Sequence, residues 1–272
     1  MTNRAHIDPE AYCDLAYAFD GTLEGLLTAV FQAYALHEDP ADVLQSNALQ
    51  PRLGQLVRDI PTDVQLAKRV EAGLRRKAGT RAFELCRVVS ASDRPDAGTL
   101  VYRFIRYAMK EGRSCLRQVM HPAVEPMLAE RHFLAMEKER LLQFVRFREL
   151  EGGLWFAQCN PRGNLVPFVM DHFAGRFNTQ AFIIYDEVHH LAGIYDGSGW
   201  YLASVNDQAF LERLPTEART EAQMQQAWRL FYRSVSIDAR YNPELRTHFM
   251  PKRFWKNLTE VQEVLPSLVS KR

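Results

Sequence analysis

The hydrophobic pattern of this chain changes its period near Gln143, and this change constrains the fold more than any other feature. Before it, apolar residues recur at the three- and four-residue spacings of amphipathic helices. After it, they alternate with polar residues, as they do in half-buried strands. We therefore predict an α+β protein in which a helical layer packs on a mostly antiparallel sheet. It is predicted to form one domain over residues 1–272, with a mainly helical part at 1–142 and a sheet-containing part at 143–272.

The first half is expected to begin with a strand at residues 14–19 that ends at the turn Asp20-Gly21. A helix then starts near Thr22, with Asp20 or Thr22 as its N-cap, and runs to Leu36. Residues 62–90 are predicted to form two helices that divide near Gly79, with Thr62 or Asp63 as the N-cap of the first. Further helices are predicted at residues 95–117 and 122–142.

The second half is expected to form a ββαβββ unit. A hairpin joins residues 144–149 to residues 154–159 through Glu151-Gly152-Gly153. The remaining elements are a helix at 166–176, strands at 181–186, 191–196 and 200–205, and helices at 207–214 and 221–235.

The composition is that of an ordinary soluble protein, with 47% hydrophobic and 25% charged residues. No apolar run is long enough to span a bilayer, and the N-terminus lacks the regions of a signal peptide. We expect a cytoplasmic protein without a membrane partner.

Local motifs for cofactors and metals are missing from the sequence. The cysteines at positions 13, 86, 115 and 159 are too far apart for a CxxC pair. The sequence has no GxxxxGK[ST] loop, GxGxxG turn, HExxH helix or GxSxG elbow. We therefore expect neither a cofactor nor a metal site, which weakens the case for an enzyme without excluding one.

Charge is distributed unevenly along the chain. Residues 5–51 contain no Lys or Arg and eight acids, which are Asp8, Glu10, Asp14, Asp20, Glu24, Glu38, Asp39 and Asp42. Residues 68–87 reverse this balance, with seven basic residues against Glu71 and Glu84. Because phosphates repel acids, the acidic stretch is expected to lie away from nucleic acid, or to cover a basic surface when none is bound.

The C-terminal segment at residues 246–256 places four cations among three large aromatic rings. Cations bind phosphates and flat rings stack on bases, so this segment is a candidate for nucleic-acid binding. Its candidate residues are Arg246, Lys252, Arg253, Phe254, Trp255 and Lys256. Alternatively, the rings fill a core while the cations face water. Because neighbouring residues tend to face different ways, we expect Trp255 in the core and Phe254 more exposed.

A second basic surface is predicted on the helix at residues 95–117. Five cations recur there at spacings of three and four residues, which would place them on one helix face about 21 Å long. These residues are Arg103, Arg106, Lys110, Arg113 and Arg117. The ridge can follow a phosphate backbone, or it can be a solvated face paired with acids of the helix at 122–142 (Glu125, Glu130, Glu137 and Glu139).

Two groups of residues are weak candidates for acid–base chemistry. Asp171 and His172 lie on a short predicted helix, with Arg176 one turn later and His189-His190 on a following turn. Asp20 and Glu24 lie at a strand-to-helix turn, where a paired-carboxylate site competes with a simpler role in capping the helix.

Three stretches resemble the bacterial "probable DNA metabolism protein" family. The most specific is C-terminal and comprises WRLFYRSVSI at 228–237, RYNP at 240–243 and FMPKRFWKNLTE at 249–260. The others are FDGTLEGLLTAVF at 19–31 and YDG at 195–197. The resemblance implies a domain of unknown function, linked to DNA repair through a neighbouring gene for a radical-SAM protein and through fusion of some members to a uracil-DNA glycosylase. It implies no catalytic residues.

Our leading hypothesis is therefore a DNA-repair or DNA-metabolism accessory protein that binds DNA through its two basic surfaces and works with a radical-SAM protein. The sequence lacks the three closely spaced cysteines of a radical-SAM cluster, so any cluster chemistry belongs to the partner. One alternative is a glycosylase or hydrolase that acts on modified DNA. Another is a protein–protein adaptor that docks through its acidic stretch.

Overall fold

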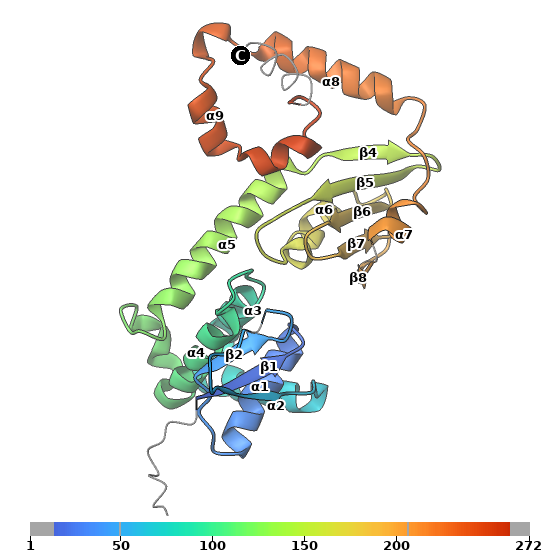
Figure 1. Ribbon diagram of the computed structural model, residues 1–272. Helices are drawn as coiled ribbons and strands as arrows, with labels where there is room; N and C mark the ends of the chain where they lie inside the picture. The colour runs from blue at the N-terminus through green and yellow to red at the C-terminus, as the bar shows by residue number, and fades with distance from the viewer. Residues whose placement is uncertain (1–13, 49, 206, 262–272) are drawn as a thin grey trace, which may run out of the picture. The chain divides into compact units, whose positions relative to one another are not determined.

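The computed structural model describes residues 14–48, 50–205 and 207–261. The chain divides into two compact units, Met1–Phe133 and Leu134–Arg272, and the boundary falls within helix α5 (Glu125–Phe144). The predicted α+β class is confirmed (Figure 1). Whether the two units form one domain stays a prediction. Asp8, Glu10 and Cys13, which entered the charge and cysteine arguments, lie outside the described residues.

The first unit contains a three-stranded parallel sheet in the order β2-β1-β3. Its central strand β1 (Leu15–Phe19) is confirmed, whereas β2 (Asp42–Gln45) and β3 (Leu56–Asp59) were not predicted. Helix α1 (Leu23–Ala35) begins after Thr22, whose side chain accepts a hydrogen bond from the backbone N–H of Gly25.

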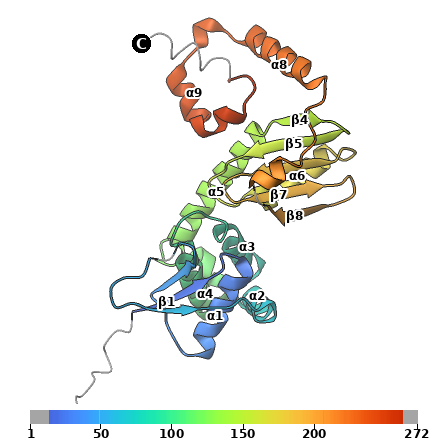
Figure 2. The same cartoon turned by 45° about the vertical axis from the view of Figure 1, so that its right-hand side comes forward.

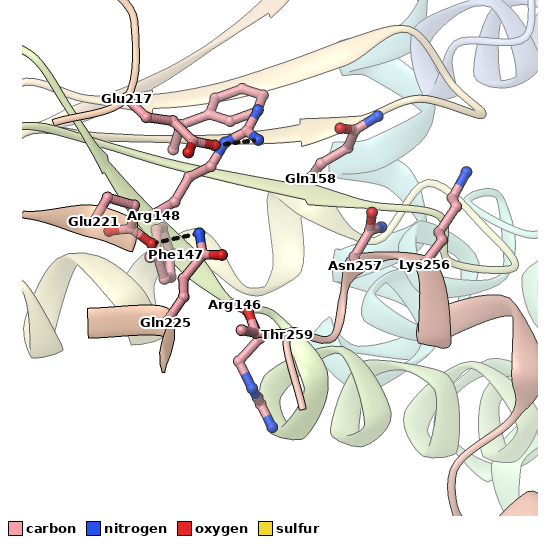
Figure 3. Close-up of a pocket in the computed structure, with 11 residues that line it drawn as sticks. Arg146, Phe147, Arg148, Gln158, Glu217, Glu221, Gln225, Lys256, Asn257 and Thr259 are labelled. Atoms are coloured by element: carbon pink, nitrogen blue, oxygen red, sulfur yellow. Dashed lines mark hydrogen bonds and ion pairs between the residues drawn. The ribbon is translucent and has the colours of Figure 1, made fainter. Parts of the chain in front are cut away.

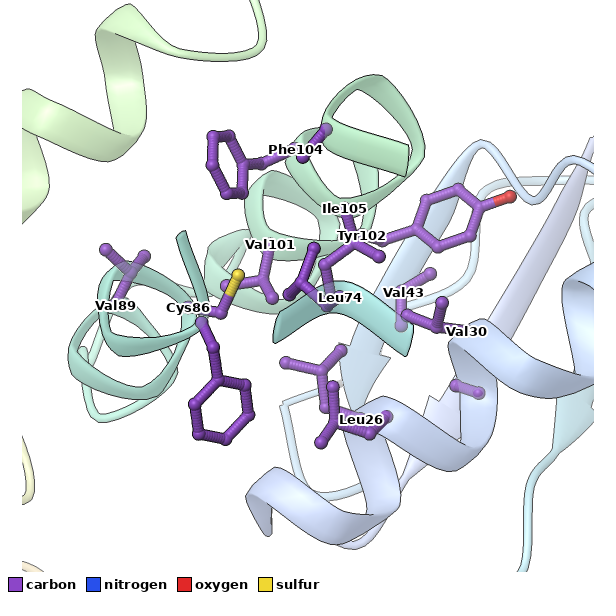
Figure 4. Close-up of a cluster of buried hydrophobic side chains, with 14 of the residues drawn as sticks. Leu26, Val30, Val43, Leu74, Cys86, Val89, Val101, Tyr102, Phe104 and Ile105 are labelled. Atoms are coloured by element: carbon purple, nitrogen blue, oxygen red, sulfur yellow. The ribbon is translucent and has the colours of Figure 1, made fainter. Parts of the chain in front are cut away.

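The remaining helices of this unit surround a large apolar core (Figure 4). Helices α2 (Val64–Ala78) and α3 (Thr80–Val89) divide at Gly79 as predicted, and Asp63 caps α2. Helix α4 (Ala97–Glu111) lies against the edge strand β2. There the Thr99 hydroxyl accepts from the backbone N–H of Val43 and donates to its carbonyl.

The second unit contains the predicted ββαβββ arrangement as a five-stranded sheet, and Figure 2 shows its strands from a second side. The strands are β4 (Phe147–Leu150), β5 (Leu154–Cys159), β6 (Phe182–Asp186), β7 (Leu191–Tyr195) and β8 (Trp200–Ser204), adjacent in that order. Only the β5–β6 pair is parallel within this sheet. The crossover between these strands contains the 3-10 helix η2 (Val166–Phe168) and helix α6 (Met170–Arg176). A Cβ at Gly193 of β7 would lie 2.4 Å from the Met170 sulfur, so this glycine permits the close packing of α6 on the sheet.

The C-terminal part of the second unit is helical. Helices α7 (Asp207–Leu211) and α8 (Glu221–Val235) match the predictions, although α7 ends three residues early. The structure adds three short helices: η3 (Asp238–Arg240), α9 (Pro243–Phe249) and η4 (Lys252–Asn257). A hydrogen bond of 2.9 Å holds helix α8 to strand β4. The backbone N–H of Glu149 donates it to the carboxylate of Glu221, a buried residue.

Candidate nucleic-acid interface

Arg253, one of the predicted phosphate ligands, is bound inside the second unit. Its guanidinium donates to the carboxylate of Glu137, which has no exposed side-chain area. The same carboxylate accepts from Arg140 at 2.5 Å and from the backbone N–H of Arg162 at 3.4 Å. A buried carboxylate needs such partners, so Arg253 has a structural role that competes with phosphate binding.

The expected exposures of Phe254 and Trp255 are wrong. Phe254 is the core residue, with 4% of its surface exposed, and its ring lies 5.3 Å from that of Phe144. Trp255 is half-buried and donates its indole N–H to the carbonyl of Met250. The reason is that residues 252–257 form a 3-10 helix, in which side chains are spaced about 120° apart and successive residues do not simply alternate between faces.

The other cations of the segment differ in their partners. The guanidinium of Arg246 lies 4.7 Å from the centre of the Trp255 ring, an arrangement typical of a cation–π interaction. Lys256 pairs with Glu187, whereas the exposed Lys252 has no side-chain partner among the described residues. Two of the four predicted cations are therefore held by carboxylates, and two are not.

The structure adds a pocket of about 440 Å³ between the end of α8 and α9. Figures 1 and 2 show these two helices joined by a short connection, which contains η3. Tyr232, Tyr241 and Phe249 contribute rings to the pocket, and Arg240 and Arg246 contribute guanidinium groups.

Two of the three aromatic side chains that line this α8–α9 pocket are largely exposed. Tyr241 and Phe249 expose 57% and 65% of their surfaces. Neither Arg240 nor Arg246 has a carboxylate partner among the described residues. Exposed apolar surface of this kind commonly marks an interaction site. The sequence signal was present in the mixture of rings and arginines at residues 228–246, but the pocket itself depends on the turn between the helices.

Helix α8 is fixed near its middle by Glu260, a residue close to the end of the described chain. One carboxylate oxygen of Glu260 accepts from Arg146 at 2.8 Å, and the other accepts from the indole N–H of Trp228 at 3.0 Å. Burial raises the pKa of Glu260, but the hydrogen bonds from Arg146, the backbone and Trp228 outweigh it and lower the pKa below its ordinary value. Glu260 therefore remains ionised and stabilises the segment that forms the α8–α9 pocket.

A second pocket, of about 170 Å³, lies beside β4 and β5 (Figure 3). It contains cations, but each one has a carboxylate partner. Arg148 pairs with Glu217 at 3.0 Å, and Lys256 with Glu187. Arg146, at its edge, pairs with the buried Glu260. Because its positive charge is largely neutralised, this pocket is a weaker candidate for phosphate than the α8–α9 pocket.

The predicted five-cation ridge does not lie on one α-helix. Helix α4 ends at Glu111 because Gly112 has a φ of 69°, and residues 112–117 continue as the 3-10 helix η1 (Gly112–Arg117). The stacking of Arg113 and Arg117 above Arg103 was therefore wrong. Lys110, Arg113 and Arg117 remain exposed and have no side-chain partner among the described residues.

Four of the six described acids of the acidic stretch pair with arginines of their own unit. Arg106 pairs with Asp39 at 2.6 Å, and Arg58 with Glu38 at 2.8 Å. Arg52 bridges Asp14 and Asp42 at 2.8 and 2.6 Å. Of the acids proposed as partners of the ridge, Glu130 binds Ser92 and Arg94, and Glu137 binds Arg253 and Arg140.

The predicted acid–base residues of α6 lie at the surface. Asp171 accepts a hydrogen bond of 2.7 Å from the indole of Trp200, and the His172 ring lies edge-on to Phe173. Neither residue lines the α8–α9 pocket or the pocket beside β4 and β5. His189 instead binds Asp186, a buried residue, at 2.6 Å, and His190 has a φ of 52° in the following turn.

Asp20 and Glu24 lie at the start of helix α1, where Asp20 supports the N-cap Thr22 and Glu24 belongs to the first turn. The carboxylate of Asp20 accepts from the backbone and hydroxyl of Thr22 at 2.9 and 2.6 Å, and from the hydroxyl of Thr62 at 2.7 Å. Burial opposes ionisation of Asp20, but these hydrogen bonds lower its pKa overall. A Cβ at Gly25 would lie 2.2 Å from this carboxylate, so the glycine in the sequence FDGTLEG makes room for the cap.

The described residues contain neither a metal-binding cluster nor a membrane-spanning helix. No cluster of three or more His, Cys, Asp or Glu side chains suitable for a metal ion occurs in residues 14–48, 50–205 and 207–261. Within the same ranges, every helix is too short or too polar to cross a membrane.

Comparison with known proteins places the chain in a family. The solved structure of the pGpG-specific phosphodiesterase PggH from Vibrio cholerae matches with a TM-score of 0.36 and 10% identity, over 74% of this chain and 96% of that one. This likeness is too weak to support an argument about fold or activity. No curated protein matches the chain. The family model of the domain of unknown function DUF4130 matches residues 95–260, which is more than half of the sequence. The chain therefore belongs to the DUF4130 family.

Proposed function

We propose that this chain is an accessory protein of DNA repair or DNA metabolism that binds nucleic acid at the α8–α9 pocket. The observation that carries the proposal is the concentration in that pocket of exposed rings and of arginines that have no carboxylate partner among the described residues. The residues that resemble the DNA-metabolism family at 228–243 and 249–260 include most of those that build it.

The chemistry of the pocket suits a polyanion with aromatic bases. Tyr241 and Phe249 offer ring faces on which bases can stack, and each such stacking interaction contributes about 1–3 kcal/mol. Arg240 and Arg246 offer guanidinium groups that bind phosphate oxygens. Lys252 supplies a further exposed cation in the next helix along the chain.

The proposal includes a radical-SAM protein as the partner, and a uracil-DNA glycosylase as a second one, because the family resemblance implies both. Two surfaces are candidates for the contact with the radical-SAM protein, the acidic stretch at residues 8–42 and the basic segment at residues 103–117. Lys110, Arg113 and Arg117 favour the second surface, because they are exposed and have no side-chain partner in the part of the chain that the structure describes, whereas four acids of the first surface are paired with Arg52, Arg58 and Arg106. Co-purification of the two proteins at low and high salt tests this contact, which is expected to weaken as salt increases.

A titration of the purified chain with single- and double-stranded DNA at two salt concentrations tests nucleic-acid binding. Affinity is expected to decrease steeply with salt, because bound cations displace counterions from DNA. The variants Tyr241→Ala and Phe249→Ala are expected to bind more weakly while melting at the wild-type temperature. Absence of binding at low salt, or an affinity that does not respond to salt, would contradict the proposal.

The alternative of a base-processing enzyme has a separate test. The isolated chain is incubated with DNA that carries modified bases, and release of a base or cleavage of a strand is measured. We expect neither reaction. Turnover that is abolished by Asp171→Asn or His172→Ala would replace the accessory function with an enzymatic one.

A further inference from the structure

The first unit contains an apolar groove that the nucleic-acid proposal does not use. It has a volume of about 470 Å³ and lies between helices α1, α2 and α4. Its apolar lining includes Val30 and Phe31 of α1, Val70 of α2, and Ile105 and Met109 of α4. Val30 and Ile105 also belong to the buried core of this unit (Figure 4), so the bottom of the groove is continuous with that core.

Gly73 lies in the wall of this α1–α2–α4 groove, in the interior of α2. Glycine lowers the stability of a helix interior, so such a residue usually has a packing or functional reason. Among the described residues, a Cβ at this position would meet only the methyl group of Met109, at an ordinary contact distance of 3.9 Å. Packing within the unit therefore does not require the glycine, and its effect is to keep the groove open.

Two arginines of α2 line the groove without a carboxylate partner. Arg69 and Arg76 are exposed, and no acid pairs with either of them among the residues the structure describes. The guanidinium of Arg69 lies 4.8 Å from the centre of the Phe31 ring. By contrast, Arg75 on the same helix pairs with Glu71 at 2.8 Å and with Glu84 at 3.5 Å. Among the cations of α2 that have no carboxylate partner in the described residues, Arg69 and Arg76 are the two that line the groove.

The spacing of the two arginines indicates the shape of the occupant. Arg69 and Arg76 are seven residues apart, so they lie on one face of α2 about 10.5 Å from each other along its axis. One small anion cannot pair with both. A second helix that lies along α2 can, because acids seven residues apart on its surface have the same spacing.

We infer that the α1–α2–α4 groove binds a helix of a partner protein, which places apolar side chains in the groove and carboxylates opposite Arg69 and Arg76. The apolar lining provides burial, and the two arginines provide charge complementarity and fix the register. The partner segment is therefore an amphipathic helix whose apolar stripe is flanked by acidic residues.

Two synthetic peptides test this inference on the full chain. Both are helical and carry leucine at positions i, i+3 and i+7, and they differ only in having glutamate or lysine at the flanking positions. The glutamate peptide is expected to shift the NMR amide signals of α1, α2 and α4, and to bind at least about tenfold more tightly than the lysine peptide. The charge-reversed variant Arg69→Glu/Arg76→Glu is expected to prefer the lysine peptide.

A pair of substitutions at Gly73 separates the groove from general effects on the helix. Gly73→Leu fills the groove and is expected to reduce the affinity for the glutamate peptide by at least about tenfold, whereas Gly73→Ala keeps it within about twofold. The inference is overturned if the wild-type chain binds neither peptide or binds both equally. A concentration-dependent dimer that Gly73→Leu disrupts would also overturn it, by assigning the groove to a second copy of the chain.

Discussion

The guanidinium of Arg253 is bound to the buried carboxylate of Glu137, and these residues are 116 positions apart in the sequence. This ion pair joins the C-terminal basic segment to helix α5 within the second unit. The amide of Asn160 also donates to the carbonyl of Arg253 at 3.0 Å. The basic segment is therefore part of the folded framework, and substitutions in it change stability as well as any binding.

We expect Arg253→Ala to lower the free energy of unfolding by about 3–5 kcal/mol, because it leaves a buried carboxylate with one fewer cation. Because Glu137 keeps its ion pair with Arg140, we expect the loss of stability to lie near the lower end of that range. The control is Lys252→Ala, which removes the neighbouring exposed cation and is expected to change stability by less than about 0.5 kcal/mol. Urea denaturation at neutral pH measures both, and equal stabilities would contradict the proposed role of Arg253.

Phe254 and Trp255 form a second pair of neighbours with different roles. Phe254→Ala is expected to lower the free energy of unfolding by about 3–5 kcal/mol, because it empties a buried site next to Phe144. Trp255→Ala is expected to have a smaller effect, since its ring is half-buried. Denaturant titrations of the two variants give the comparison. A larger loss from Trp255→Ala would restore the original assignment of that residue to the core.

Sequence patterns were sufficient for elements with a clear period or cap. The helix after Thr22 and the break at Gly79 both follow from local chemistry, and both are present. Strand β3 was missed because all four of its residues are exposed, so it has no alternating pattern, and it is recognised only through its pairing with β1. Helix α4 was predicted to continue to residue 117, but it ends at Glu111, because Gly112 adopts a φ of 69°.

The candidate site was predicted in composition but not in geometry. The sequence identified residues 246–256 as rich in rings and cations. It contained no signal for the pairing of Arg253 with Glu137, because that contact joins distant parts of the chain. The α8–α9 pocket likewise depends on the turn at residues 236–242, which brings Tyr232 and Phe249 into the lining of one pocket.

Two glycines of the first unit are expected to respond oppositely to alanine. Gly25→Ala places a methyl group 2.2 Å from the Asp20 carboxylate and should lower the free energy of unfolding by about 1–3 kcal/mol. Gly73→Ala meets no atom of the described residues closer than 3.9 Å and should raise it by about 0.4–1 kcal/mol. Thermal unfolding of the two variants distinguishes them. A destabilised Gly73→Ala protein would mean that this glycine has a packing role.

Glu260 is expected to make stability depend on pH in the acid range. Its pKa is lower in the folded protein than its ordinary value of 4.5. Its stabilising effect is therefore fully present above 4.5 and is lost as the pH falls through the lower folded pKa. The stability difference between wild type and Glu260→Gln should be larger near pH 7 than near pH 3.5. Denaturant unfolding at both pH values checks this, with Glu217→Gln as the control for loss of one carboxyl group.

Arg240 provides the sharpest test of nucleic-acid binding, because it lies in the α8–α9 pocket and is exposed, whereas Arg253 is engaged in the fold. If Arg240 contacts one phosphate, Arg240→Ala should weaken binding to all DNA sequences similarly. It should also reduce the slope of log affinity against log salt by about 1. Arg219→Ala is the matched control, since Arg219 is an exposed arginine of the same unit that does not line the pocket. Binding isotherms at several salt concentrations give the slope for each variant. An equal reduction of the slope in the two variants would mean that the arginines act through overall charge and not through the pocket.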